Sequence, residues 1–198
     1  MRGLLKLSSA IDWINAQVGR WVIWLILGST LISGINASVR KAFNVSSNAY
    51  LEVQWYLFAA AFLLASGYTL LNGEHVRIDV VASRLSKRKQ IWIDIIGFAF
   101  FLTPMCLVVL YFGIPFFLQG FHSGEMSSNA GGLIRWPVYL MMPAGFVLLL
   151  IQGISELIKR IAYLRGLIPD PTLKVQAKSA EEELAEEIRR QAERDAKA

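Results

Sequence analysis

Few side chains in this sequence belong to the types that perform catalysis or bind metals. The chain has two histidines, His75 and His122, and one cysteine, Cys106. The distribution of Lys and Arg described below places the two histidines on opposite faces of a membrane, so they cannot share a metal site or hold a haem between helices. A lone cysteine forms no CxxC pair or zinc site, and the sequence contains no Gly-rich phosphate loop, nucleophile elbow or HExxH helix. We therefore expect no enzyme, no cofactor and no metal.

Two acidic residues lie beside long apolar runs and are the main candidates for buried charge. Glu52 opens one run, and Asp94 lies just inside another. Ion-coupled carriers place ionisable groups near the middle of the membrane, whereas the polar residues in the middle of these runs are serines and threonines. We therefore expect interhelical salt bridges rather than an ion pathway. The expected partners are Arg40 or Lys41 for Glu52, and Arg84, Arg88 or Lys89 for Asp94.

A charged corner follows the second apolar run. His75, Arg77 and Asp79 alternate there with aliphatic residues. Charged groups so close to a membrane span should lie at the headgroup level. An Arg77–Asp79 pair exposed to water would contribute only about 0–1 kcal/mol. Contact with a partner, or constraint of the local conformation, therefore explains these residues better than stability does.

Four uncharged apolar runs position these residues, and each is about long enough to cross the hydrocarbon core as a helix. We place the spans at about residues 18–40, 50–72, 90–121 and 136–160. Hydrophobic residues make up 55% of the chain, and the short alternating segments of a β-barrel are absent from the sequence. We therefore predict an all-α membrane protein with four transmembrane helices in residues 1–168, embedded in the lipid bilayer, followed by a charged tail over residues 169–198.

Two of the segments should depart from straight membrane helices. Apolar residues recur at spacings of three and four from Leu4 to Val18, which predicts an interfacial amphipathic helix. This helix should lie on the membrane surface and either bend or continue into the first span. The third run is longer than a straight crossing needs, and Pro104 and Pro115 are its natural kink positions.

The Lys and Arg residues near the predicted spans are distributed unequally between the two sides of the membrane. The richer side has Arg2, Lys6, Arg77, Arg84, Lys87, Arg88, Lys89, Lys159, Arg160 and Arg165. The other side has Arg40, Lys41 and Arg135. Because the richer side is normally cytoplasmic, we expect both termini in the cytoplasm. The same placement explains the sequence pI of about 9.5 better than nucleic-acid binding does.

Four short motifs point to one family. The first is Arg40-Lys41-Ala42-Phe43-Asn44 after the first span, with Ser46 nearby, and the second is Glu52 at the start of the next span. HVRIDV at residues 75–80 and WPVYLMMPAGF at residues 136–146 complete the pattern. With these motifs the chain, from about Leu4 to Leu167, resembles the small membrane subunit (DctQ type) of tripartite ATP-independent periplasmic, or TRAP, transporters.

The resemblance implies a division of labour among three proteins of a bacterial inner membrane system. A large membrane subunit would hold the sodium and substrate sites, and a periplasmic binding protein would capture an organic acid. The small multi-pass subunit would pack beside the large one as a fixed scaffold. The candidate residues for this partner interface are Arg40, Glu52, His75, Arg77, Asp79, Pro137, Pro143 and Gly145.

We expect the contact with the large subunit to involve mainly the first two spans. Ser29 and Ser33 on the first span, with Ala61 and Ala65 on the second, have the spacing of small residues that allows helices to approach closely. Two alternatives remain open. The chain could be the membrane anchor of a redox enzyme, or it could be a stand-alone small carrier.

Overall fold

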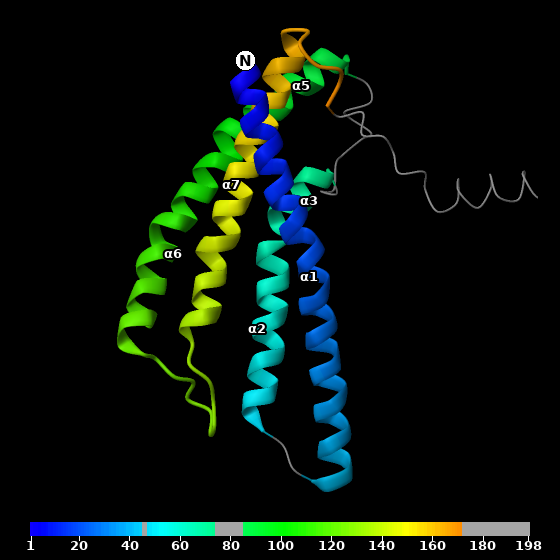
Figure 1. Ribbon diagram of the computed structural model, residues 1–198. Coiled ribbons are helices and arrows are strands. Elements are labelled where there is room, and N and C mark those ends of the chain that lie inside the picture. Colours follow the sequence, from blue (N-terminus) through cyan, green and yellow to red (C-terminus); the bar gives the residue numbers. More distant parts are fainter. Residues whose placement is uncertain (45–46, 74–84, 172–198) are drawn as a thin grey trace, which may run out of the picture.

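The computed structural model describes residues 1–44, 47–73 and 85–171, and almost all of this part is helical (Figure 1). The helices are α1 (Arg2–Phe43), α2 (Asn48–Leu64), α3 (Ser66–Asn72), α5 (Lys87–Ile96), α6 (Thr103–Ser123) and α7 (Trp136–Leu164). A π-helical turn, η1 (Gly97–Leu102), joins α5 to α6. The predicted corner residues His75, Arg77 and Asp79, and the tail beyond residue 171, lie outside the described residues.

Four continuous stretches of helix are long and apolar enough to cross a membrane. They are Arg2–Phe43, Asn48–Asn72, Lys87–Ser123 and Trp136–Leu164, and each contains one of the predicted spans. Large apolar side chains point outward from them, for example Phe62 and Phe101, which are 74% and 73% exposed. An apolar exterior suits a protein whose surroundings are lipid. The prediction of an all-helical protein with four membrane-length helices is confirmed.

Helix α7 is the centre of the bundle, because it contacts α1, α2, α3, α5, η1 and α6. Figure 1 shows α1 beside α2 on one side of α7, with α6 on the other side. We call the upper end in that view, which has the amino terminus, α5 and the end of α7, the terminal end. The lower end has the loop 124–135 and the start of α2, and we call it the loop end.

Helix α1 is one unbroken helix of 42 residues, which corresponds to a length of about 63 Å. The sequence left open whether the amino-terminal segment bends or continues into the first span, and here it continues. The apolar positions Leu4 and Leu7 are about half exposed, whereas Ser8 and Asn15 are buried. The side of α1 that packs against the rest of the protein is therefore mixed: it includes Ile11 (8% exposed) beside Ser8 and Asn15, whereas Arg2 and Lys6 are exposed. Lipid accepts apolar side chains, so polar groups gain more from a partner inside the bundle.

Small residues let α2 and α3 lie very close to α7. A Cβ added at Gly145 of α7 would lie 2.5 Å from the carbonyl oxygen of Leu63, and one added at Gly67 would lie 3.0 Å from the carbonyl oxygen of Leu148. Ser66, at the start of α3, donates hydrogen bonds to the carbonyls of Leu63 (2.7 Å) and Gly145 (3.3 Å). Close backbone approach of this kind replaces the hydrophobic drive that helices lack in lipid.

The third membrane helix changes direction at η1, the π-helical turn before Pro104. Proline has no N–H to continue the ladder of backbone hydrogen bonds. One residue earlier, the backbone N–H and the hydroxyl of Thr103 both bond to the carbonyl of Phe98, the hydroxyl at 2.8 Å. In Figure 1, α5 runs across the view while α6 runs downward. One of the two predicted kink positions, Pro104, thus directly follows the irregular turn, whereas Pro115 lies inside α6.

Candidate functional site

The polar groups that the structure buries are concentrated in two clusters near opposite ends of the bundle. The first, which we call the loop cluster, joins Glu52 of α2 to the loop 124–135. The second, the seam cluster, joins α1, α5 and α7 near the terminal end through the side chains of Ser8, Asp12, Asn15, Asp94, Gln152, Ser155, Glu156, Lys159 and Arg160. Along α7, the distance from Trp136 to Glu156, 20 positions later, is about 30 Å, the thickness of the hydrocarbon core.

The loop cluster is built around a single buried carboxylate. Glu52 is 1% exposed and lies in the first turns of α2. One of its oxygens accepts hydrogen bonds from the Ser127 hydroxyl and from Asn129 Nδ2 (2.9 Å). The other oxygen accepts the backbone N–H of Leu133 at 2.7 Å. Three donors from the loop therefore compensate the charge of a side chain that water does not reach.

The loop itself has a regular core that holds these donors in place. Met126 and Ile134 form an antiparallel bridge, and the N–H of Ser127 bonds to the carbonyl of Leu133 at 2.9 Å. Two side chains of α2 bond to the loop backbone: Tyr56 to the carbonyl of Ile134 (3.2 Å) and Asn48 to the carbonyl of Ala130 (3.1 Å). The loop is thus attached along the first turns of α2.

The predicted partners of Glu52 were wrong. Among the described residues no ion pair joins Glu52 to Arg40 or Lys41, and both bases are exposed at the end of α1. A signal for the correct partner exists in the sequence, since the loop is rich in Ser, Asn and Gly, residue types that offer hydrogen-bond donors and permit tight turns.

The seam cluster aligns polar side chains of α1 and α7. Asn15 Nδ2 donates to Gln152 Oε1 at 2.9 Å, and Gln152 Nε2 donates to Asp12 at 2.9 Å. Asp12 also accepts the Ser155 hydroxyl at 2.7 Å and pairs with Lys159 Nζ at 3.0 Å. These contacts connect residues that lie 137 to 147 positions apart in the chain. They fix the first turns of α1 on the last turns of α7.

Arg160 extends the seam cluster to α5. Its guanidinium is 3% exposed and pairs with Asp94 of α5 at 2.8 Å and with Glu156 one turn earlier. The same group lies over the ring of Phe98, 4.6 Å from its centroid, in a cation–π arrangement. The predicted partners of Asp94 were Arg84, Arg88 or Lys89. Arg84 lies outside the described residues, and the described base that pairs with Asp94 is Arg160 of α7.

The other candidate interface residues fall into three groups. Pro143 and Gly145 are buried inside the bundle, where Gly145 packs on Leu63. Pro137 is half-buried in the first turn of α7, and Arg40 is exposed in the last turn of α1. His75, Arg77 and Asp79 lie outside the described residues.

The serines expected to contact a partner instead join α1 to α2. Ser29 donates to the carbonyl of Gln54 at 2.9 Å, and Gln54 Nε2 donates to Ser33 at 3.0 Å. Ala61 is also buried, at 3% exposed. Ser29 and Ala61 thus pack within this chain, since small residues indicate a close helix contact without saying which helix makes it. Contact of the large subunit with the first two spans stays a prediction.

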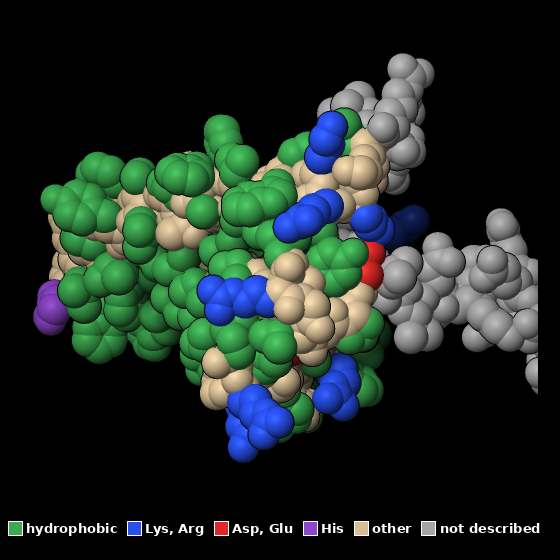
Figure 2. All heavy atoms as spheres, turned by 90° about the horizontal axis from the view of Figure 1, so that it is seen from above, with side chains coloured by type: hydrophobic (Ala, Val, Ile, Leu, Met, Phe, Trp, Pro, Cys, Tyr) green, Lys and Arg blue, Asp and Glu red, His purple; other side chains and the backbone are tan. Residues whose placement is uncertain are grey.

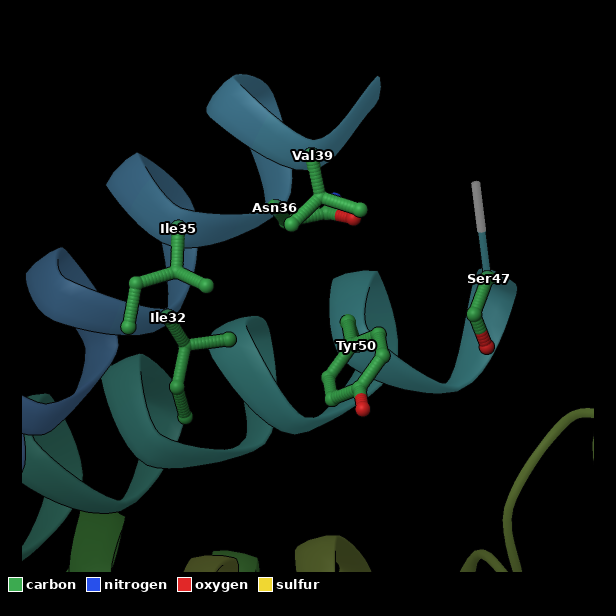
Figure 3. A pocket seen from close by; sticks show the side chains of 6 residues that line it. All are labelled: Ile32, Ile35, Asn36, Val39, Ser47 and Tyr50. Atoms are coloured by element: carbon green, nitrogen blue, oxygen red, sulfur yellow. The ribbon is translucent and has the colours of Figure 1, made fainter. Parts of the chain in front are cut away.

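Two hollows open between the helices. The first, of about 220 Å³, lies near the loop end between α1 and α2. Figure 3 shows the residues that line it: Ile32, Ile35, Asn36 and Val39 from α1, Tyr50 from α2, and Ser47 just before α2. The second, of about 500 Å³, is lined by α1, α2, α3 and α7, including Val22, Phe62 and Phe146. Both linings are largely apolar. In the part of the chain that the structure describes, no three acidic, His or Cys side chains are grouped to hold a metal ion.

A comparison with protein families identifies the chain. The model of the family described as "Tripartite ATP-independent periplasmic transporters, DctQ component" matches residues 29–162. This range runs from the middle of α1 to the end of α7 and includes Glu52, the loop, Asp94 and Arg160. No curated protein and no solved structure matches the chain. The matched family is a transporter component and not an enzyme family. The chain therefore belongs to the DctQ family, the small membrane components of TRAP transporters.

Proposed function

We propose that the chain is the small subunit of a sodium-driven TRAP transporter for organic acids and that it acts as a scaffold for the large membrane subunit. The family membership supports the transporter role. One observation supports the scaffold role. The three buried charged side chains of the described residues all have partners within the chain: Glu52 accepts hydrogen bonds, and Glu156 and Arg160 form ion pairs. A transported anion and its coupling ions would need fixed polar partners, and these side chains already serve the fold.

The partner contacts follow from this division of roles. The large subunit would pack laterally on the apolar outer faces of the helices, where large side chains are exposed. Arg40, with His75, Arg77 and Asp79, would add polar contacts near the membrane edges. Glu52, Pro137, Pro143 and Gly145 would act indirectly, by setting the shape of the bundle. The periplasmic binding protein would approach the loop end, where Met126 is 62% exposed.

The orientation in the bacterial inner membrane is also a proposal. Most of the Lys and Arg residues beside the spans lie near the terminal end, which would therefore face the cytoplasm. The first turns of α1 would then extend from the hydrocarbon core into the cytoplasmic headgroups, since the helix is about twice as long as the core is thick. Single-cysteine labelling tests this orientation in a Cys106→Ala background. A cysteine at the exposed Ser128, next to the Ser127 that bonds to Glu52, should react with an impermeant reagent from the periplasm. Labelling from the cytoplasm alone would reverse the topology.

Reconstitution into proteoliposomes tests the scaffold role. We expect sodium-driven uptake to require the large subunit, the binding protein and this chain together, and this chain alone to transport nothing. Glu52→Gln should reduce co-purification of the large subunit through its effect on the loop, while the sodium dependence of the assembled complex stays unchanged. Glu125→Gln is the matched control, because Glu125 is half-exposed. A shifted sodium dependence with normal assembly would place the chain in the transport path.

The two alternatives make different predictions in the same preparations. Uptake by this chain alone would identify a stand-alone carrier. A haem absorption band in the purified protein would identify the anchor of a redox enzyme.

A further inference from the structure

Helix α5 presents a face that the fold does not use. Its opposite side is fixed by packing, because Ile91 is fully buried and Asp94 pairs with Arg160. The outward side has Trp92, Ile93 and Ile96, which are 52%, 55% and 47% exposed. The exposed bases Arg88 and Lys89 lie one turn before these side chains.

Arg88 and Lys89 do not serve the stability of the helix. Cations in the first turn of a helix are disfavoured by the helix dipole, and the first turn of α5 has no acidic residue to compensate them. Among the described residues, no carboxylate forms an ion pair with Arg88 or Lys89, whereas their neighbour Lys87 pairs with Asp170 at 3.4 Å. No described carboxylate therefore neutralises the charge of Arg88 and Lys89, and both side chains are exposed.

The surroundings of the two bases indicate what kind of anion would suit them. Figure 2 views the terminal end directly and shows Lys and Arg side chains spread across it, with few acidic ones. Arg88 and Trp92 are four residues apart, as are Lys89 and Ile93, so each base shares a helix face with an exposed apolar side chain. A lipid fits both features, because its phosphate can meet the bases while its acyl chain meets the apolar side chains.

We propose that the face of α5 formed by Arg88, Lys89, Trp92 and Ile93 binds the headgroup of an anionic phospholipid. The negatively charged phosphate pairs with the two bases, and the indole of Trp92 lies at the boundary between headgroup and acyl chain. A zwitterionic lipid binds less well, because its own ammonium group competes for the phosphate. The site is independent of the transport role proposed above, so the two can fail separately.

The binding test uses the full-length protein and a defined lipid. Phosphatidylglycerol is titrated against protein in detergent, with the zwitterionic, net-neutral phosphatidylcholine as the comparison, and bound lipid is counted by native mass spectrometry. Each Lys or Arg near an anionic headgroup strengthens binding about fivefold, so Arg88→Gln with Lys89→Gln should weaken binding about 25-fold. Equal affinity of the unchanged protein for both lipids would overturn the proposal.

A matched pair of bases controls for general charge attraction. Arg40→Gln with Lys41→Gln removes two adjacent exposed bases from the loop end and should leave α5 unaffected. A photoactivatable phosphatidylglycerol in nanodiscs should label a peptide within residues 85–97, and only the α5 variant should lose this label. Loss of the label in the Arg40 and Lys41 variant as well would refute a local site. Displacement of the lipid by millimolar glycerol phosphate would show a site for free phosphate and also overturn the assignment.

Discussion

Replacing Glu52 by glutamine is the most direct test of the loop cluster. The two carboxylate oxygens accept three hydrogen bonds, from Ser127, Asn129 and the N–H of Leu133. The amide of glutamine offers one oxygen and one NH₂ group, so in either orientation the NH₂ group faces a donor. If the oxygen keeps Ser127 and Asn129, the N–H of Leu133 loses its acceptor. A hydrogen bond to a charged group contributes about 1.5–3 kcal/mol, and we expect the loop to lose about 2 kcal/mol of local stability.

Hydrogen exchange of the Leu133 amide measures this loss directly. A loss of about 2 kcal/mol makes exchange of this amide roughly 30 times faster. Because the loop contains no proline, each of its residues has a backbone amide whose exchange can be followed. Glu125→Gln provides the comparison, because Glu125 is 46% exposed and holds Arg135 at 3.6 Å; its effect should be only a few-fold. Unchanged exchange at Leu133 in the Glu52 variant would refute the role of this carboxylate in fixing the loop.

Three further changes test other parts of the fold. Gly145→Ala introduces a Cβ 2.5 Å from the Leu63 carbonyl oxygen and should destabilise the protein by about 1–3 kcal/mol, seen as a lower melting temperature in detergent; an unchanged temperature would mean that α2 and α7 are less close. Arg160→Gln removes one of the two bases that pair with Glu156, while Lys159 stays, and should cost about 1.5–3 kcal/mol; a smaller loss than for Lys159→Gln would contradict this. Truncation after Pro171 should leave membrane insertion intact, because the removed tail has few large apolar side chains. A reduced membrane yield of the truncated protein would show that the tail contacts the bundle.

Local sequence signals were sufficient for the helices and for the family. Each membrane helix follows from a long uncharged run, and the irregular turn near Pro104 follows from the missing N–H of proline. HVRIDV at residues 75–80 together with WPVYLMMPAGF at residues 136–146 indicates the DctQ family from the sequence alone. These signals are local in the chain, and they do not depend on which helices meet.

The polar contacts could not be predicted in the same way. Glu52 has bases nearby in the sequence, yet its donors come from a loop 75 to 81 positions later. Asp12 and Asn15 resemble the solvent-facing side of a surface helix, yet they face α7, where Ser155 and Gln152 supply their hydrogen-bond partners. In each case the partner is selected by the packing of distant helices, which the pattern of one helix does not encode.

The contact between α1 and α7 has a consequence for biogenesis. Asn15 and Gln152 are 137 positions apart, so at about 5–20 residues per second the ribosome needs about 7 to 27 s to supply the partner. During this time the polar side of α1 must be solvated by water, lipid headgroups or the insertion machinery. Helix α1 is therefore inserted long before its hydrogen bonds to α7 can form. Synthesis of α7 is the step that completes the bundle.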